Sequence, residues 1–316
     1  MFIPVLYIVL PCFNEEAVLE SSIAQLSELY QRLLSSESIS PDSRFLFVDD
    51  GSKDNTWQII QKNTVTNPFV CGIKLAKNVG HQNAILAGME TAIEYADVVI
   101  TIDADLQDDI EKIPEMLQKF RDGADIVYGV KNERRVDSRF KRATAKLFYK
   151  LMRTLGVETV YNHADFRLMS KRAVHALSGY HERNLFLRGI IPSIGYKTDV
   201  VYEDLRARQA GESKYTLSKM LNLAVDGITS FSIKPVRFVV ILGFVFILIS
   251  LGILIYVLTS VIKGNYVAGW ASLMLSIWFI GGCILVCLGI VGEYVGKIYM
   301  EVKERPRYHI EEKLIK

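Results

Sequence analysis

Apolar and polar positions alternate along the first 130 residues in two periods. Short apolar runs predict strands at residues 5–10, 44–49, 70–75, 98–102 and 126–129. Longer segments with the period of a helix predict helices near residues 17–35, 54–64, 82–95 and 110–122. Strands separated by helices imply right-handed crossovers and a mainly parallel α/β sheet. Ligands bind such sheets at the carboxyl ends of the strands, so the residues after each strand are the candidates for a site.

The C-terminal third contains two long runs without a charged residue, at 238–262 and 267–292. Each run exceeds the roughly 20 residues needed to cross a bilayer. Residues 263–266 join them, a linker too short for a domain, so residues 236–293 are expected to form a hairpin of two transmembrane helices. These runs explain why the mean hydropathy is +0.20 although the charged fraction, 23%, is ordinary. They exclude a purely soluble, a disordered and a secreted disulfide-rich protein.

Charge around the hairpin predicts its orientation. Basic residues flank it on both sides, whereas the linker carries only Lys263, and the flanking residues are Lys234, Arg237, Lys297, Lys303, Arg305 and Arg307. Positively charged flanks stay in the cytoplasm, which predicts a cytoplasmic domain at 1–215 and a cytoplasmic tail at 294–316. The four cysteines lack a disulfide or metal-ligand spacing, which fits a reducing cytosol. A net charge of +2 argues against a nucleic-acid partner.

Two amphipathic segments are expected near the membrane surface. Residues 139–155 place apolar and basic side chains at helical spacing, which suits a helix lying in a lipid interface. A surface helix packed on the sheet is the alternative. Residues 216–235 form a second amphipathic stretch leading into the first apolar run.

The turns after the first four predicted strands are unusually polar, at residues 11–16, 49–56, 77–82 and 103–108. Carboxylates at the same end of successive strands favour a site for a cation or a polyol. Helix capping is the alternative, because Asp, Asn and Ser are preferred at helix starts. We prefer capping for Asp54 and Asp109, but not for the acidic pair Asp103 and Asp105.

Two of these segments carry candidate chemistry. Asp103-Ala104-Asp105 is a D-x-D sequence that, with Gln107, offers oxygen ligands suited to Mg²⁺ or Mn²⁺ completed by substrate phosphates. The ion would neutralise charge on a diphosphate leaving group. The loop at 206–215 includes Arg208 and Lys214, whose donors are suited to gripping phosphates. A solvated charged loop is the alternative for that segment.

Five motifs resemble those of one family. They are Pro-Cys-Phe-Asn-Glu-Glu at 11–16, Asp-Asp-Gly-Ser-Lys-Asp-Asn-Thr at 49–56, Asp-Ala-Asp-Leu-Gln-Asp at 103–108, Asp-Phe-Arg-Leu-Met-Ser at 165–170 and Arg-Gln-Ala-Gly-Glu-Ser-Lys-Tyr at 208–215. In this order they resemble the polyisoprenyl-phosphate glycosyltransferases of glycosyltransferase family 2, which include dolichol-phosphate mannose synthases and bactoprenol glucosyltransferases. The resemblance covers the whole chain and implies a Rossmann-like GT-A fold. Ala164 departs from the pattern, since many members have Gly there.

The resemblance also implies roles for individual residues. Pro11, Phe13 and Glu15 would hold the nucleoside of the nucleotide sugar, and Val48 and Asp50 would hold its base. Its ribose and diphosphate would lie near Asp103, Ala104 and Asp105. Arg208 and Lys214 would bind the diphosphate. Asp105 and Gln107 would ligate the metal. Asp105 and Asp165 are the catalytic candidates, with Asp165 near the acceptor as a weakly supported base. Position alone suggests Arg134, Arg135 and Arg139 for the lipid phosphate.

The expected reaction is inverting transfer of a sugar to a polyisoprenyl phosphate, undecaprenyl phosphate, at the inner membrane of a bacterial cell. UDP-glucose is the first choice of donor, because the two-span form is more similar to the bactoprenol glucosyltransferases than to the mannose synthases. Transfer from GDP-mannose, as in the mannose synthases, is the alternative enzyme. A non-enzymatic scaffold or a sugar-lipid transporter is the alternative from another class. The resemblance and the glycines of the second span also suggest a homo-oligomer, with a tetramer as one form.

Overall fold

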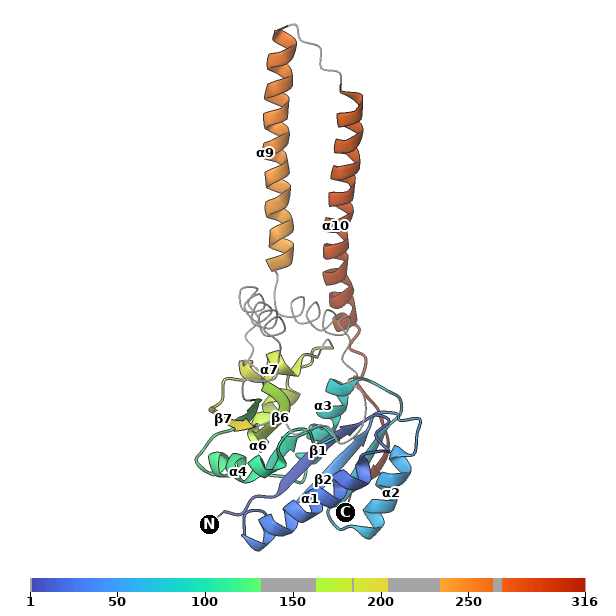
Figure 1. Ribbon diagram of the computed structural model, residues 1–316, viewed down its shortest axis with the longest axis vertical. Helices are drawn as coiled ribbons and strands as arrows, with labels where there is room; N and C mark the ends of the chain where they lie inside the picture. Colours follow the sequence, from blue (N-terminus) through green and yellow to red (C-terminus); the bar gives the residue numbers. More distant parts are fainter. Residues whose placement is uncertain (1, 132–162, 184, 204–233, 264–268, 316) are drawn as a thin grey trace.

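The computed structural model describes residues 2–131, 163–183, 185–203, 234–263 and 269–315 (Figure 1). Several predicted features lie outside these residues. They are the helix at 139–155, residues 216–233 of the second amphipathic stretch, and the candidate ligands Arg134, Arg135, Arg139, Arg208 and Lys214.

The first five strands and their helices occur where the sequence predicts them. The elements are β1 (Leu6–Cys12), α1 (Leu19–Ser35), β2 (Arg44–Asp49), α2 (Thr56–Thr66), β3 (Val70–Leu75), α3 (His81–Ala92), β4 (Val98–Thr101), the 3-10 turn η1 (Ile110–Lys112), α4 (Ile113–Arg121) and β5 (Ile126–Lys131). Strands β4, β1, β2 and β3 are neighbours and run parallel. Their carboxyl ends therefore share one edge, as the α/β prediction requires.

Helices cover both faces of this sheet because β1 is apolar on both sides. Leu6, Ile8 and Leu10 pack in the cluster that contains the buried residues of α1, α2 and α4. Tyr7 and Val9 pack in the other cluster, with α3, α6 (Lys171–Ser178) and α7 (Leu187–Ser193). Two buried faces explain why the strands read as continuous apolar runs.

The second half of the domain adds elements that the sequence analysis does not predict. Strand β6 (His163–Ser170) lies between β4 and β5 and runs antiparallel to both. Strand β7 (Thr198–Glu203) lies beyond β5 and runs parallel to it. Because β6 starts at the edge where β4 ends, the Asp-Phe-Arg motif is brought next to the D-x-D turn.

The C-terminal segment returns to the sheet. Strand β8 (Ile310–Leu314) pairs antiparallel with β3 and completes the order β7-β5-β6-β4-β1-β2-β3-β8. Glu312 accepts hydrogen bonds from Trp57 Nε1 and Gln61 Nε2 of α2, at 3.2 and 3.1 Å. Residues 294–316, expected as a tail, thus include the end of a helix and a strand of the main sheet.

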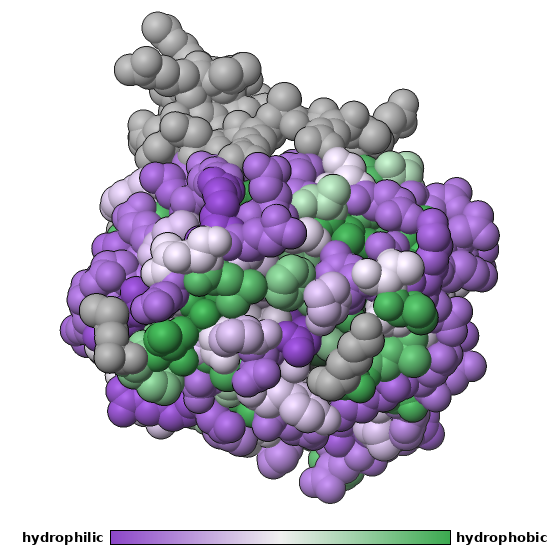
Figure 2. All heavy atoms as spheres, turned by 90° about the horizontal axis from the view of Figure 1, so that it is seen from below, coloured by the Kyte–Doolittle hydropathy of each residue, from purple (hydrophilic) through white to green (hydrophobic). Residues whose placement is uncertain are grey.

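Two long helices, α9 (Lys234–Ile262) and α10 (Trp270–Val302), extend away from the sheet (Figure 1). They contact each other, for example through Phe246 and Phe279, whose ring centroids are 5.7 Å apart. Many of their described apolar side chains are exposed, whereas the opposite end of the domain is mainly hydrophilic (Figure 2). Within the described residues, one segment, Phe279–Val302, is long and apolar enough to cross a membrane, and Val236–Phe246 is a shorter apolar helix.

An acidic pair is buried where β7 meets the turn after β4. Glu203 is fully buried and accepts a hydrogen bond from the Asp109 backbone N–H at 2.8 Å. The neighbouring Asp108 is also buried, with its carboxylate 2.9 Å from Lys131 Nζ. Burial, together with the negative charge of Asp108, raises the pKa of Glu203 to about 7.

The close packing of α3 on the sheet gives a first prediction. A Cβ added at Gly88 would lie 2.3 Å from Val9 Cγ1 and 2.8 Å from Val48 Cγ2. Gly88→Ala should therefore lower the free energy of unfolding by about 1–3 kcal/mol, although Ala in a helix is normally better than Gly by about 1 kcal/mol. Thermal or denaturant unfolding measures this. Val9→Ala combined with Gly88→Ala should cost less than the sum of the two single changes, and a neutral Gly88→Ala would contradict the packing.

The buried Glu203 gives a prediction about pH. Its pKa is near 4.5 when unfolded and about 7 when folded, so the folded state binds more protons between these values. The stability of the native chain therefore falls as pH rises through this window. Glu203→Gln cannot lose that proton, and its stability relative to the native chain should increase by about 1 kcal/mol or more between pH 5 and 8. Melting temperatures at both pH values test this, and a pH-independent difference would refute it.

Candidate active site

The turns after β1 and β2 are joined by hydrogen bonds. The backbone N–H of Asn14 donates to Ser52 Oγ at 3.0 Å, and the N–H of Lys53 donates to Asn14 Oδ1 at 2.8 Å. Glu15 N–H donates to Thr56 Oγ1 at 2.9 Å. The predicted nucleoside-binding turn at 11–16 is thus held against the turn at 49–56. Phe13 lies in it with 39% of its surface exposed, accessible to a ligand.

Two acidic residues in these turns act as the capping interpretation predicts. Asp54 accepts hydrogen bonds from both the N–H and the hydroxyl of Thr56 at the start of α2. Asp109 caps η1 by accepting from Glu111 N–H at 3.2 Å. Both are explained by local backbone donors, so neither is needed as a ligand.

Asp50 is placed by the turn that precedes α3. Its carboxylate accepts from Val79 N–H at 2.7 Å and from Gly80 N–H at 3.0 Å. Burial raises the pKa of Asp50, and these two donors oppose the rise. In this structure Asp50 holds the turn at 77–80, and the predicted contact with a nucleobase stays a prediction. Neighbouring Gly51 has φ +68° and an added Cβ would lie 2.7 Å from Asn78 N, so the close approach requires glycine.

The D-x-D turn follows β4 and is fastened to α1. Ala104 is buried, and its carbonyl accepts from Ser22 Oγ at 2.6 Å. Asp103 keeps 51% of its side-chain surface exposed. Partial removal from water and the charges of Asp165, Asp108 and Asp105 raise its pKa to about 6. Half of the Asp103 side chain still faces solvent. Of the two causes of its raised pKa, the crowding of negative charge is therefore the one that matters for binding a cation.

Asp105 and Gln107, the two residues predicted to hold a metal, lie together. Gln107 Nε2 donates to Asp105 Oδ2 at 2.7 Å. A carboxylate, an amide oxygen and surplus negative charge nearby form a donor set that fits Mg²⁺ or Mn²⁺ with the remaining ligands from phosphates. The described part of the chain has no group of three or more His, Cys, Asp or Glu residues that could hold a metal alone.

Asp165, which keeps 13% of its side-chain surface exposed, is the centre of a cluster of charged side chains. Arg167 Nη2 lies 2.5 Å from its Oδ1, and Arg188 Nη2 lies 3.0 Å from its Oδ2. His81 Nε2 lies 3.3 Å from Asp165 Oδ2 and 3.6 Å from Asp103 Oδ1. Burial alone would raise the pKa of Asp165, but Arg188, His81 and Arg167 hold it well below its ordinary value. Such a carboxylate is poorly suited to accept a proton.

The structure thus brings Asp103 and Asp165 together through His81, which the sequence analysis did not select. Arg167 and Arg188 were also missed. His81 lies in the polar turn at 77–82 that the sequence analysis noted without assigning a role, and Arg167 lies inside the motif at 165–170. Arg188 has no sequence motif to mark it, because only the packing of α7 beside α3 brings it to Asp165.

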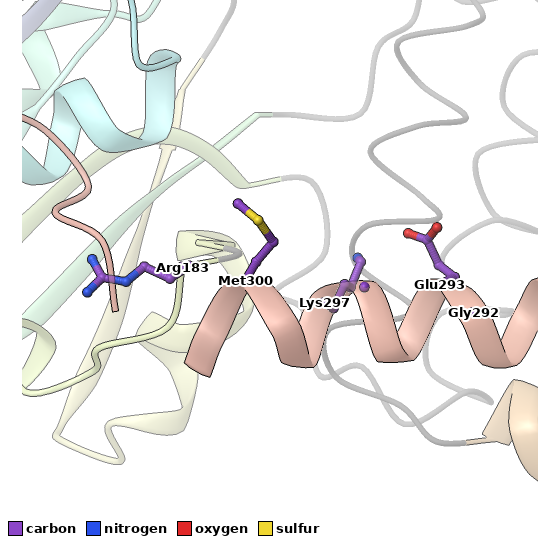
Figure 3. A pocket seen from close by; sticks show the side chains of 6 residues that line it. Arg183, Gly292, Glu293, Lys297 and Met300 are labelled. Carbon is purple, nitrogen blue, oxygen red and sulfur yellow. The ribbon is translucent and has the colours of Figure 1, made fainter. Parts of the chain in front are cut away.

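A separate pocket of about 380 Å³ lies at the sheet-proximal end of α10 (Figure 3). Its lining residues are Arg183, Gly292, Glu293, Gly296, Lys297 and Met300. None of them is a predicted site residue, so this pocket is distinct from the D-x-D turn.

Comparison with known proteins identifies the family. The family model described as Glycosyl transferase family 2 matches residues 7–178. The "Uncharacterized glycosyltransferase YkoT" of Bacillus subtilis is 52% identical over 308 residues, covering 98% of this chain and 91% of that protein. The "SfII prophage-derived bactoprenol glucosyl transferase" of Shigella flexneri is 40% identical over 309 residues, covering 96% of each chain.

Among solved structures, the mannosyltransferase PcManGT from Pyrobaculum calidifontis, in complex with GDP-Man and Mn²⁺, is 16% identical with a TM-score of 0.45. The matched region covers 67% of this chain and 59% of the mannosyltransferase. This likeness is too distant to add to the assignment. The family match and the near full-length relatives confirm the resemblance seen in the motifs and the GT-A type of fold. The chain belongs to glycosyl transferase family 2 and is a glycosyltransferase.

Proposed function

We propose that this enzyme transfers glucose from UDP-glucose to a polyisoprenyl phosphate, undecaprenyl phosphate, with inversion at the anomeric carbon. The observation that carries the proposal is the 40% identity, over 96% of both chains, to a protein named bactoprenol glucosyl transferase. Because the match includes α9 and α10 as well as the catalytic domain, it favours a lipid acceptor over a soluble one.

In this proposal the donor lies across the carboxyl ends of β1, β2 and β4. The nucleoside and base contact Pro11, Phe13, Glu15, Val48 and Asp50. The ribose and diphosphate contact Asp103, Ala104 and Asp105. Arg208 and Lys214 close over the diphosphate. Asp105 and Gln107 hold a divalent cation, Mg²⁺ or Mn²⁺, which would neutralise charge on the departing diphosphate. Arg134, Arg135 and Arg139 remain candidates for the lipid phosphate.

The acceptor arrives as an anion, so transfer needs no strong base. The site must align the phosphate with the anomeric carbon and stabilise the leaving diphosphate. We therefore assign Asp165 a positioning role, holding Arg188 and His81, in place of the predicted base. Its low pKa and its three cationic or hydrogen-bonding neighbours support this assignment.

We propose further that α9 and α10 form a transmembrane hairpin in the inner membrane of a bacterial cell, with the catalytic domain cytoplasmic. The exposed apolar side chains of both helices and the basic residues at their sheet-proximal ends support this. Self-association, with a tetramer as one form, is part of the proposal. Glycines along α10 would allow helices of neighbouring copies to approach closely.

Family membership sets aside the non-enzymatic scaffold and the transporter. Transfer from GDP-mannose remains the second candidate. Membranes containing the protein, incubated with polyprenyl phosphate, a divalent cation and a panel of radiolabelled nucleotide sugars, separate the two. Label from UDP-glucose in the lipid phase is the expected result. Label from GDP-mannose alone would replace glucose by mannose, and no lipid label from any sugar would refute the acceptor.

The metal assignment gives a prediction with a matched control. Asp105→Ala should reduce metal-dependent transfer by at least about a hundredfold, because the carboxylate that would hold the cation is lost. Asp109→Ala, in the same acidic turn, should cost only about 1 kcal/mol of stability through the lost cap and keep transfer. Initial rates across a Mn²⁺ and a Mg²⁺ titration are measured for both. A fully active Asp105→Ala enzyme would remove the metal assignment.

A further inference from the structure

His81 lies between the D-x-D turn and the motif at 165–170. Its Nε2 is 3.3 Å from Asp165 Oδ2 and 3.6 Å from Asp103 Oδ1. His81 hydrogen-bonds to Asp165, whereas it acts on Asp103 through charge, because 3.6 Å is too long for a hydrogen bond. Removal from water would lower the pKa of His81, but the contact with Asp165 and the charge of Asp103 raise it on balance.

The same imidazole stabilises both carboxylates in their charged form. Removal from water raises the pKa of Asp103 most, His81 opposes this rise, and the charge of Asp165 adds to it. His81 is also one of the groups that lower the pKa of Asp165. Two carboxylates that repel each other thus share one neighbour that attracts both. The position of His81 therefore affects the D-x-D turn and Asp165 at once.

The backbone on both sides of His81 is held by other parts of the chain. Asp50 accepts hydrogen bonds from the backbone N–H groups of the two residues before His81, at 2.7 and 3.0 Å. The second of them, Gly80, has φ +90°, which favours glycine, and directly precedes α3. On the other side, Gln82 Oε1 accepts from Leu187 N–H at 2.8 Å. These contacts limit the directions in which the imidazole can point.

The backbones of the two aspartates are fixed without help from His81. Thr101 Oγ1 donates to the Asp165 carbonyl at 2.5 Å. Ser22 Oγ donates at 2.6 Å to the carbonyl of Ala104, the residue after Asp103. Loss of the imidazole should therefore change how the two carboxylates are oriented while the fold is kept.

We propose that His81 is a positioning residue, which holds the carboxylates of Asp103 and Asp165 in the orientation that sugar transfer requires. The inference rests on the proposed function, in which Asp103 lies beside the ribose and diphosphate of the donor and Asp165 lies near the acceptor. His81 would align these two parts of the site without contacting either substrate. A misplacement of about 1 Å is enough to slow a reaction about a hundredfold.

The kinetic test compares His81→Leu, His81→Gln and the control His175→Leu. His175 is an exposed histidine of α6. His81→Leu removes the hydrogen-bond donor and should lower kcat about ten- to a hundredfold. The KM for each substrate should change less than about twofold, because no substrate contact is lost. His81→Gln keeps a donor at Nε2 and should recover part of kcat, and His175→Leu should match the native enzyme.

A double-mutant cycle shows whether His81 acts through Asp165. Residues that contact each other have non-additive effects when both are changed. The factor by which His81→Leu lowers kcat should therefore be at least about threefold smaller in the Asp165→Asn background than in the native chain. In the Asp109→Ala background, which lacks only a helix cap, the factor should equal that in the native chain.

Three kinetic outcomes overturn the inference. Native-like kinetics of His81→Leu remove the positioning role. A KM raised about tenfold for either substrate, with kcat unchanged, makes His81 a residue that binds substrate. Additive effects of His81→Leu and Asp165→Asn show that His81 does not act through Asp165. Native-like melting temperatures and UDP binding show that each variant is folded.

A spectroscopic measurement keeps the inference separate from the proposed function and needs no variant of His81 in the kinetic assay. Imidazole signals of isotopically labelled histidine are followed by NMR over a pH titration, and the His81 signal is identified by its absence from His81→Gln. The pKa of His81 should be lower in Asp165→Asn than in the native protein, because the carboxylate that raises it is gone. It should not change in Asp109→Ala.

The two measurements fail in distinguishable ways. An unchanged pKa of His81 in Asp165→Asn refutes the inference whatever the reaction is. If UDP-glucose gives no product but the pKa of His81 falls as expected, the proposed donor fails and the positioning contact stands. The kinetic comparison is then made with the nucleotide sugar that does label the lipid.

Discussion

The carboxylate of Asp165, which keeps only 13% of its side-chain surface exposed, constrains the site more than any other group. A charge removed from water must be compensated by neighbouring charges and hydrogen bonds. Arg167 from the same strand, Arg188 from α7 and His81 from α3 supply this compensation. Three separate elements must therefore dock correctly before the carboxylate is stable. The inserted strand β6 makes this docking possible, because Thr101 of β4 pairs with Arg167 in register and donates its hydroxyl to the Asp165 carbonyl.

This constraint divides the edge of the sheet into two electrostatic halves. Asp103, Asp105 and Asp108 concentrate negative charge on the turn after β4, while Arg167 and Arg188 concentrate positive charge around Asp165. His81 lies between the halves and faces an aspartate of each. The surplus of carboxylates in the first half suits a cation.

Local features of the fold could be predicted from the sequence, and non-local ones could not. The ends of β2 and β3 agree with the prediction because apolar periodicity and turn residues act within a few positions. The D-x-D turn was found for the same reason. Strands β6 and β8 were missed because their pairing partners lie far away in the chain. Arg188 was missed because its meaning depends on the contact of Leu187 with Gln82, 105 positions earlier.

The position of the site relative to a membrane follows from α10 if the hairpin spans it. The helix carries no charged residue from Trp270 to Gly292, and then Glu293, Lys297 and Glu301. The last ten residues would project about 15 Å beyond the apolar part. At the end of α10, Glu301 accepts a hydrogen bond from the backbone N–H of Arg183. After the helix, Arg307 donates to the Glu182 carbonyl and β8 pairs with the sheet. Because helix and sheet are linked at both ends of the segment 303–309, a hairpin that spans a membrane would limit how far this edge of the sheet can move relative to the membrane surface.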